Sequence, residues 1–330
     1  MPSMMNRRLA AQAALLSLCA VRAAPARAQD FPSRTVTLIL PYPPGGGADV
    51  IARALAEGLQ QRLQRAVIVE HRPGASGIVG TQAVANAPAD GHTVLITVTQ
   101  AALTNQFLFD KLPYDTRRDF AFISEVVAAP LVLVVNAEHP ARTPQQLLDW
   151  AAQQRDTVSY GSWGAGSYPH MVGAYLARQR RLEFVHVPYR GEAPMLQELA
   201  AARLSFALAS VASVKPLIAA GKLRALALMG RQRHAALPEL PTFAETGMVD
   251  EELRAEGWLG LMVPAATPAP VVQRLEREVQ AVARQPELQA RFAPLGFRIV
   301  GSSGAEFRQH YEQDLPVLQR LVKVSGARVN

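Results

Sequence analysis

Pro41-Tyr42-Pro43-Pro44-Gly45-Gly46-Gly47-Ala48-Asp49 is the stretch that decides the fold. The apolar run from Val36 to Leu40 precedes it and has the composition of a buried strand. Apolar residues at helical spacing follow it: Ile51, Leu55, Leu59 and Leu63. A glycine-rich loop between a strand and a helix is typical of a parallel α/β sheet, in which ligands bind at the carboxyl ends of the strands.

This first glycine loop predicts a binding site for a small anion. It matches neither G-x-x-x-x-G-K-[ST] nor G-x-G-x-x-G, which argues against nucleotides. It contains no Lys or Arg, so anion binding would rest on backbone N–H groups and the helix dipole, which suits one carboxylate. Glycines that only satisfy a tight turn are the alternative, and Asp49 could cap the helix instead of meeting a ligand. The candidate residues are Tyr42, Pro44, Gly45, Gly46, Gly47, Ala48 and Asp49.

A second glycine loop, Gly161 to His170, again separates a predicted strand from a predicted helix. Two such loops, one per domain, could face each other across a cleft. Here the candidates are Ser162, Ser167 and His170 as hydrogen-bonding groups, with Trp163 and Gly166 as walls. Tyr189 and Arg190 follow another strand, and Arg190 could supply a full positive charge to a carboxylate. The alternatives are a histidine that belongs to a helix start and an arginine that is only solvated.

Short β-branched runs alternate with longer amphipathic segments along the whole chain, which predicts an α/β fold with largely parallel sheets. Hydroxyl residues three positions before Glu or Gln predict helix starts at Thr143, Thr242 and Ser303. The predicted strands are 35–40, 66–70, 93–98, 131–135, 157–160, 184–187, 204–208, 223–228, 258–263 and 297–300.

Residues 1–28 read as a signal peptide. Arg7 and Arg8 precede the apolar segment from Leu9 to Val21, and small residues flank a cut after Ala28. The apolar segment is too short for a stable membrane anchor, so we expect an exported protein of the bacterial periplasm. The only cysteine, Cys19, lies in this leader, so the mature chain would have neither disulfides nor thiolate metal sites.

Charge and motifs exclude several function classes. The net charge of +7 falls to 7 − 4 = +3 once the four leader arginines are removed, and scattered charges argue against nucleic-acid binding. We find no G-x-S-x-G, no H-E-x-x-H and no histidines at metal-ligand spacing, so we expect no enzyme, no metal and no cofactor. The remaining length of about 300 residues favours two domains.

Taken together, ordered segments of the mature chain resemble the extracytoplasmic solute-binding proteins of tripartite tricarboxylate transporters, the Bug or TctC-like proteins. The matching segments are 31–34, 41–49, 70–75, 111–115, 186–191, 221–227 and 237–242. Their joint order and spacing span nearly the whole mature chain.

The resemblance implies a type II periplasmic binding protein fold, or Venus flytrap, with two α/β domains joined by a two-strand hinge. The hinge would be Leu131–Val135 and Trp258–Val263, with domain 1 at 29–135 plus 258–330 and domain 2 at 136–257. A carboxylate would be held by the first glycine loop and by Thr97, Val98, Thr99 and Gln100. The implied partners are the ligand and the transporter's membrane subunits, and we expect a monomer. Presenting the ligand to a membrane sensor is the alternative role.

Three departures from the family pattern bear on the ligand. Gln100 brings bulk and an amide where relatives usually have small residues. Ala209-Ser210 stands where many relatives have Asp-Asn, which argues against an amino acid ligand and predicts a less polar wall. Trp163 replaces a smaller residue and predicts either stacking on a ring or a reduced cavity.

Overall fold

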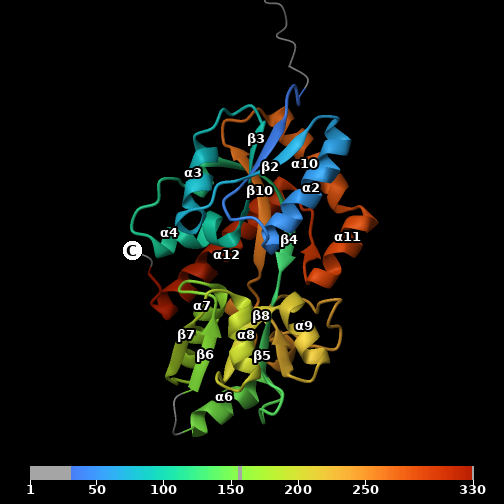
Figure 1. The fold of residues 1–330 in the computed structure, drawn as a ribbon. Helices are drawn as coiled ribbons and strands as arrows, with labels where there is room; N and C mark the ends of the chain where they lie inside the picture. The colour runs from blue at the N-terminus through green and yellow to red at the C-terminus, as the bar shows by residue number, and fades with distance from the viewer. Residues whose placement is uncertain (1–30, 155–157, 329–330) are drawn as a thin grey trace, which may run out of the picture.

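The computed structural model describes residues 31–154 and 158–328, arranged as two lobes that lie one above the other (Figure 1). Each lobe is a sheet covered by helices on both faces. The leader and its cut after Ala28 lie outside the described residues. Across the described ranges, no helix is both long and apolar enough to cross a membrane.

The first lobe is built on a sheet with the strand order β11-β4-β10-β3-β1-β2. β1 is parallel to β2 and β3, whereas β10 is antiparallel to β3 and β4. Its strands are β1 (Val36–Leu40), β2 (Val67–His71), β3 (Thr93–Val98), β4 (Phe120–Ala129), β10 (Gly257–Pro264) and β11 (Arg298–Ile299). Its helices are α2 (Gly47–Leu63), α3 (Ile78–Ala85), α4 (Asn105–Leu108), α5 (Thr116–Asp119), α10 (Ala269–Ala283), α11 (Pro286–Phe292) and α12 (Gly304–Ser325).

The second lobe has the strand order β7-β6-β8-β5-β9. β6 is parallel to β7 and β8, so the carboxyl ends of these strands share one edge, and β5 is antiparallel to β8 and β9. Its strands are β5 (Leu131–Asn136), β6 (Val158–Ser162), β7 (Phe184–Pro188), β8 (Phe206–Ser210) and β9 (Leu223–Leu228). Its helices are α6 (Pro144–Gln153), α7 (Tyr168–Gln179), α8 (Glu192–Ala200) and α9 (Val211–Ala219).

The chain first crosses between the lobes at Pro130, where β4 ends and β5 begins. Proline has no N–H to donate to a ladder, which ends the pairing of one sheet before the next begins. The segment Leu131–Val135, predicted to belong to domain 1, lies in β5 and pairs within the second sheet instead. The ten-residue strand β4 was not predicted, because its apolar run has no alternation and no turn before Pro130.

α12 is a further link between the lobes. It packs against β4 in the first lobe and against α7 in the second (Figure 1). Near its end, Arg320 pairs with Glu252, which also accepts a hydrogen bond from Tyr175 of α7. A division that assigns residues 258–330 wholly to domain 1 therefore omits the contact that the end of α12 makes with the second lobe.

The predicted helix starts have different outcomes. Ser303 and Glu306 form the reciprocal cap of α12. Thr143 accepts a hydrogen bond from Gln146 N, but the Gln146 side chain returns to Arg142 N, so only half of that arrangement forms at α6. Thr242 and Glu245 do bond reciprocally, although they begin only the short 3-10 helix Ala244–Thr246.

Candidate functional site

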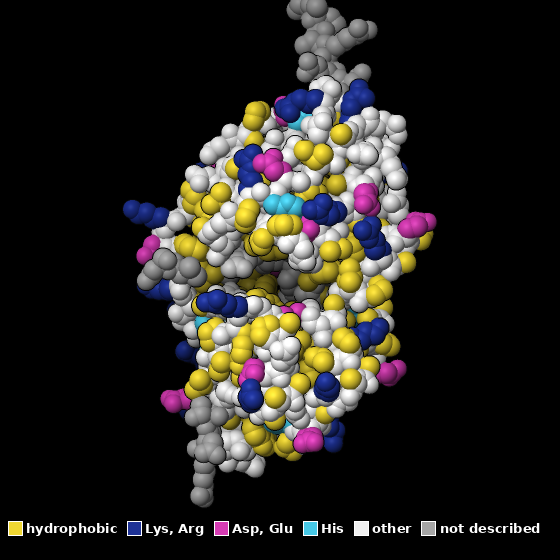
Figure 2. Space-filling model, viewed as in Figure 1, with side chains coloured by type: hydrophobic (Ala, Val, Ile, Leu, Met, Phe, Trp, Pro, Cys, Tyr) yellow, Lys and Arg dark blue, Asp and Glu magenta, His cyan; other side chains and the backbone are white. Residues whose placement is uncertain are grey.

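A cavity of about 180 Å³ lies between the two lobes, and Figure 2 shows a hollow in the middle of this face. Its walls come from the N-terminal ends of α2 and α7, from the residues after β3, and from the crossing strands β4 and β10. The lining residues are Ala48, Ile51, Val98, Thr99, Gln100, Thr104, Val127, Ala129, Trp163, Gly166, Ser167, Tyr168, Gly257, Trp258, Leu259 and Phe297.

The lobes touch each other beside this cavity. A Cβ atom on Gly166 of the second lobe would lie 2.9 Å from Leu108 Cδ1 of the first. A Cβ atom on Gly296 of the first lobe would lie 2.6 Å from Val211 Cβ at the start of α9. The two lobes therefore pack closely against each other beside the cavity.

The N-terminus of α2 has free hydrogen-bond donors beside the cavity. Gly46 is the N-cap, and no side chain caps the helix. Among the described residues, the N–H groups of Gly46, Gly47 and Ala48 have no acceptor, and Ala48 lines the cavity. Consecutive free N–H groups at the positive end of a helix dipole form an anion-binding geometry.

Asp49 shapes this first loop from behind the cavity. Its carboxylate accepts hydrogen bonds from Gly45 N at 2.9 Å, Arg53 Nε at 2.9 Å and His71 Nε2 at 2.7 Å. Burial by itself raises the pKa of Asp49, but these hydrogen bonds outweigh it and hold the pKa below its usual value. Asp49 therefore braces the loop in front of the helix instead of capping the helix, and it does not line the cavity.

The other candidates of the first lobe divide into two groups. Val98, Thr99 and Gln100 line the cavity, although the Thr99 hydroxyl is engaged with the Trp258 backbone, at 2.8 Å from its N and 3.3 Å from its O. Tyr42 and Thr97, together with Pro44, Gly45, Gly46 and Gly47, lie outside the lining. The Tyr42 hydroxyl is buried beside Gly77 and has no hydrogen-bond partner among the described residues.

The second glycine loop is held from behind by a pair of histidines. The His186 Nε2 atom lies 2.6 Å from Ser162 Oγ, and His170 Nδ1 accepts from Gly166 N at 3.0 Å. The two rings stack with their centroids 3.9 Å apart. Ser162 and His170 therefore fix the loop without lining the cavity, whereas Trp163, Gly166 and Ser167 do line it.

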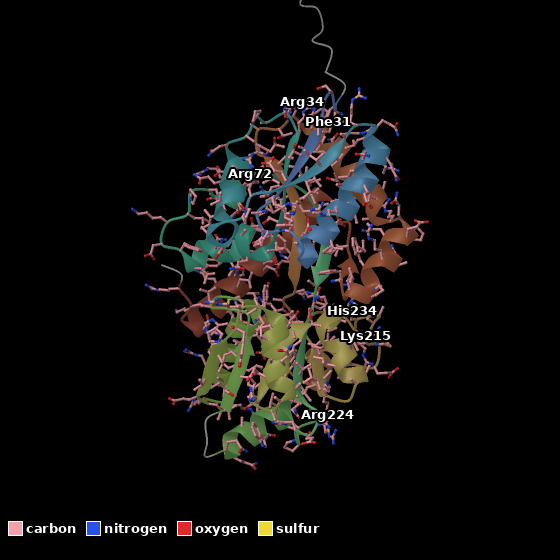
Figure 3. The ribbon with its side chains drawn as sticks, in the orientation of Figure 1. Phe31, Arg34, Arg72, Lys215, Arg224 and His234 are labelled. Atoms are coloured by element: carbon pink, nitrogen blue, oxygen red, sulfur yellow. The ribbon has the colours of Figure 1, made fainter. Side chains whose placement is uncertain are left out.

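The remaining candidates of the second lobe lie away from the cavity. Tyr189 is partly buried and Arg190 is exposed. Ala209 is fully buried in β8, and Ser210 caps α9. Arg72 and Lys215, labelled in Figure 3, lie in the upper and lower lobes and outside the lining. Of the described residues that line the cavity, none is Lys or Arg, and Arg190, the predicted cationic contact, lies outside this lining.

Nine residues that line the cavity were not predicted from the sequence, and several of them come from segments far from the predicted loops. Trp258 lies in a predicted hinge strand and Phe297 at the start of another predicted strand, but neither had a local pattern that marks a binding residue. The missed lining residues are Ile51, Thr104, Val127, Ala129, Tyr168, Gly257, Trp258, Leu259 and Phe297.

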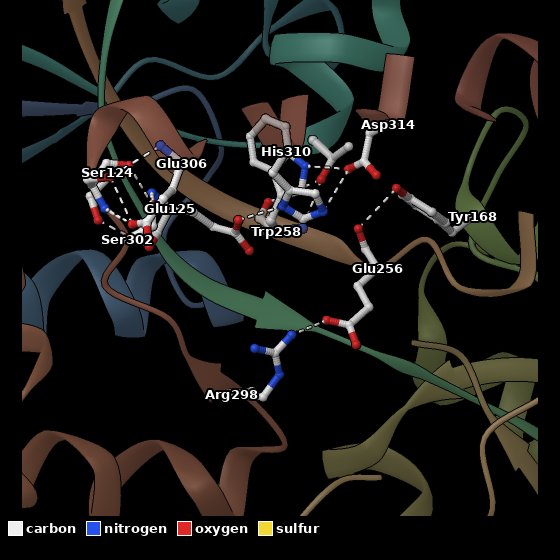
Figure 4. Close-up of polar contacts among 12 residues, drawn as sticks. Ser124, Glu125, Tyr168, Glu256, Trp258, Arg298, Ser302, Glu306, His310 and Asp314 are labelled. Atoms are coloured by element: carbon white, nitrogen blue, oxygen red, sulfur yellow. Dashed lines mark hydrogen bonds and ion pairs between the residues drawn. The ribbon is translucent and has the colours of Figure 1, made fainter. Parts of the chain in front are cut away.

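A buried ionic cluster lies behind the cavity, where β4, β10 and α12 meet (Figure 4). His310 Nδ1 lies 2.6 Å from Glu125 Oε2 and its Nε2 lies 3.5 Å from Asp314 Oδ2. Burial lowers the pKa of His310, but Glu125 and Asp314 overcome this and raise it to about 9. Burial raises the pKa of Asp314 to about 6.

The cluster connects to two walls of the cavity. The Trp258 indole N–H donates to Asp314 at 3.1 Å, which orients the ring that lines the cavity. On the second lobe, the Tyr168 hydroxyl donates to the Glu256 carbonyl at 3.2 Å, and the Glu256 carboxylate pairs with Arg298 of the first lobe (Figure 4). These contacts fix both aromatic side chains relative to the crossing strands.

Comparisons with known proteins identify the family of this chain. A family model described as "Tripartite tricarboxylate transporter family receptor" matches residues 51–326. A UPF0065 protein from the tcbD-tcbE intergenic region of Pseudomonas sp. strain P51 is 35% identical over 297 residues, covering 90% of this chain and 88% of that protein.

Solved structures share the two-lobed architecture. An R. palustris protein with adipate is 29% identical with a TM-score of 0.77, covering 91% of this chain and 100% of that one. The periplasmic binding protein BugD is 28% identical with a TM-score of 0.73, covering 90% of this chain and 99% of that one. These matches confirm the predicted fold class and the resemblance to Bug and TctC-like proteins. The chain therefore belongs to the tripartite tricarboxylate transporter receptor family.

Proposed function

We propose that this protein is a periplasmic receptor that encloses a small carboxylate between its lobes and delivers it to the membrane subunits of a tripartite transporter. The observation that carries the proposal is the set of free N–H groups at Gly46, Gly47 and Ala48, at the edge of a cavity that both lobes enclose. The adipate in the related R. palustris structure supports a carboxylate as the ligand class.

Binding requires only closure of the lobes, with no covalent step. A ligand that contacts α2 in the first lobe and Trp163 in the second stabilises the closed state, because it gains contacts that the open state lacks. We propose that the ligand contacts include seven of the sequence candidates: Ala48, Val98, Thr99, Gln100, Trp163, Gly166 and Ser167.

We further propose that the predicted signal peptide exports the protein to the periplasm. There it would act as a monomer. The name of the related BugD structure, a periplasmic binding protein, supports the location. Presentation of the ligand to a membrane sensor would use the same cavity, and no contact among the described residues favours that role over transport.

Thermal unfolding of the chain from Gln29 to Asn330, freed of ligand by unfolding and refolding, tests this function. A carboxylate at 100 times its dissociation constant adds about 2.7 kcal/mol to the free energy of unfolding. We expect a selective rise in unfolding temperature with the compound recovered unchanged. Turnover of the compound, or stabilisation by uncharged solutes alone, would contradict the proposal.

Gly46→Leu tests the free N–H groups directly. A Cβ atom at Gly46 meets no atom within 4 Å, so the fold should tolerate the side chain. The side chain would cover the approach to the α2 amides and should weaken binding about 100-fold or more, with the unfolding temperature of the free protein changed by less than about 3 °C. Ala152→Leu, on an exposed position of α6, is the control and should bind normally.

A further inference from the structure

The walls of the cavity between the lobes are uncharged and largely apolar. Within the described ranges, no Lys, Arg, His, Asp or Glu lines it. Two of its polar side chains are already engaged within the protein: the Ser167 hydroxyl donates to Gly164 O at 2.6 Å, and the Tyr168 hydroxyl donates to the Glu256 carbonyl at 3.2 Å. A ligand body with many hydroxyl or charged groups would therefore find few partners for them and would pay for the loss of its hydration.

The free backbone donors of the cleft lie at two helix starts. At α2, the N–H groups of Gly46, Gly47 and Ala48 have no acceptor among the described residues, and at α7 the same holds for Tyr168 and His170. Ala48 and Tyr168 line the cavity. These amides can meet polar groups at the ends of a ligand. The body between those ends is contacted by the side chains of the walls.

Aromatic side chains from both lobes form a large part of these walls. Trp163 and Tyr168 come from the second lobe, and Trp258 and Phe297 from the first. Trp163, Tyr168 and Phe297 are only partly buried. Of the four, Trp258 alone pairs with another aromatic ring, that of Phe307, in the part of the chain that the structure describes. The other three rings therefore line the cavity without an aromatic neighbour.

Phe297 lies directly beside the free amides of α2. A Cβ atom on Gly47 would lie 2.8 Å from Phe297 Cζ, so this glycine lets the ring lie against the start of the helix. A carboxylate bound to the α2 amides would therefore have the Phe297 ring next to the atoms that carry it. The first part of the ligand body that the protein meets is thus an aromatic contact.

Two of the aromatic walls are fixed by the protein itself. The Trp258 indole N–H donates to Asp314 at 3.1 Å, and its ring meets Phe307 edge-on with 4.9 Å between the centroids. Tyr168 is held through its hydroxyl by the Glu256 carbonyl (Figure 4). Side chains that are already held in place lose little conformational freedom when a ligand binds, which favours affinity.

The volume of the cavity fits a single ring. Pockets for drug-sized ligands measure about 300 Å³ or more. An apolar cavity of about 150 Å³, in contrast, is large enough to bind benzene. The cavity of about 180 Å³ therefore has room for one ring and a small group at its edge.

We propose that this receptor selects carboxylates carried on a single aromatic ring, with Trp163 and Phe297 as the residues that determine this specificity. The inference rests on the proposed function and narrows its ligand class. Aromatic rings in offset-stacked or edge-to-face contact contribute affinity beyond the burial of apolar area. Because Trp163 belongs to the second lobe and Phe297 to the first, an aromatic body gains such contacts from both lobes. A saturated body of similar size gains area burial alone.

Calorimetric titration of the ligand-free chain from Gln29 to Asn330 with matched acids tests this selectivity. Benzoate is compared with cyclohexanecarboxylate, and benzene-1,4-dicarboxylate with trans-cyclohexane-1,4-dicarboxylate. The two acids of a pair have the same charge, and the saturated acid buries at least as much apolar area, so area burial alone would favour the saturated acid. We expect at least one aromatic acid to bind about tenfold or more tightly than its saturated partner.

The same titrations separate failure of this inference from failure of the proposed function. Saturated acids that bind as tightly as their aromatic partners would overturn the inference and leave the proposed function standing. Hexanoate and adipate are the chain-like arms, and their binding without any binding of the ring acids would have the same meaning. Binding of benzamide without any binding of the acids, or no binding by any compound of the panel, would overturn both.

Trp163→Leu tests the ring of the second lobe while it keeps an apolar side chain. We expect the ratio of the aromatic acid's affinity to that of its saturated partner to fall about fivefold or more. Trp150→Leu is the matched control, because Trp150 lies on α6 of the same lobe, packs edge-on against His139 and is outside the lining, so the ratio should not change. Equal ratios in the two variants would overturn the role of Trp163. Phe297→Leu applies the same test from the first lobe if Trp163→Leu does not fold.

Discussion

The two glycine loops occupy corresponding places, each between a parallel strand and a helix, yet they use their polar groups differently. In the first loop a charged side chain, Asp49, binds Gly45 N and leaves the next three amides free. In the second loop, neutral groups bind one another: Ser162 with His186, and Gly166 with His170. The first loop thus leaves three consecutive amides free, whereas the second loop binds its own amides at Gly164, Gly166 and Ser167.

Among substitutions that test this difference between the loops, removal of the Asp49 charge should have the largest effect on stability and binding. Asp49→Asn keeps the shape but weakens the hydrogen bonds from Gly45, Arg53 and His71, and we expect a loss of about 1.5–3 kcal/mol in the free energy of unfolding. Because the loop also positions the free amides, carboxylate affinity should fall as well. Denaturant unfolding and calorimetric titration measure the two effects.

Asp149→Asn is the matched control for that substitution. Asp149 is 56% exposed in its side chain and pairs with Arg180 at 3.2 Å, so its loss should change the free energy of unfolding by less than about 0.5 kcal/mol. If Asp49→Asn has an equally small effect on both stability and affinity, Asp49 does not brace the loop.

As the pH falls, the second loop should lose its contribution to the free energy of unfolding at a higher pH than the first loop. Burial, and then the neighbouring His170, lower the pKa of His186 to about 4, and burial lowers the pKa of His170. The unfolded state therefore takes up protons below the ordinary histidine pKa of about 6.5, while the folded state does not. The contribution of these histidines is present above pH 6.5 and is lost as the pH falls toward 4.

The size of this acid effect is about 1–2 kcal/mol, since His186 is only half buried and solvent screens part of its shift. Asp49, whose pKa is lowered, keeps its contribution until the pH falls through its folded pKa. Urea unfolding at several pH values should show less stability loss between pH 6.5 and 4 in His186→Gln than in the unaltered protein. Identical pH profiles for both proteins would refute the assignment.

The sequence predicts binding residues that lie in a recognisable local pattern. It does not predict residues that only the fold brings to the cavity. Ala48 and Trp163 were predicted because each lies in a glycine-rich loop after a strand, and Gln100 because the resemblance to a family implies it; all three line the cavity. Trp258 and Phe297 reach the same cavity from much later in the chain, and no local spacing records that.

Charged residues were the weakest part of the prediction for the same reason. Asp49 and Arg190 had the right chemistry in the right kind of loop, but their partners are set by tertiary contacts. The contact of Asp49 with His71 comes from the neighbouring strand β2, and Arg190 lies exposed outside the cavity. The assignment of β5 to the second sheet likewise depended on its partners β8 and β9 and not on its own sequence.

A substitution of Ser167 in the second loop should have the smallest effect on stability and binding. Ser167 is the N-cap of α7 and lines the cavity, but its hydroxyl donates to Gly164 O at 2.6 Å instead of accepting from the helix amides. Ser167→Ala should therefore cost about 0.5–1 kcal/mol of unfolding free energy through this hydrogen bond, and should change carboxylate affinity less than about threefold. An affinity loss near that of Gly46→Leu would show instead that the Ser167 hydroxyl leaves Gly164 and binds the ligand, and both loops would then hold the carboxylate.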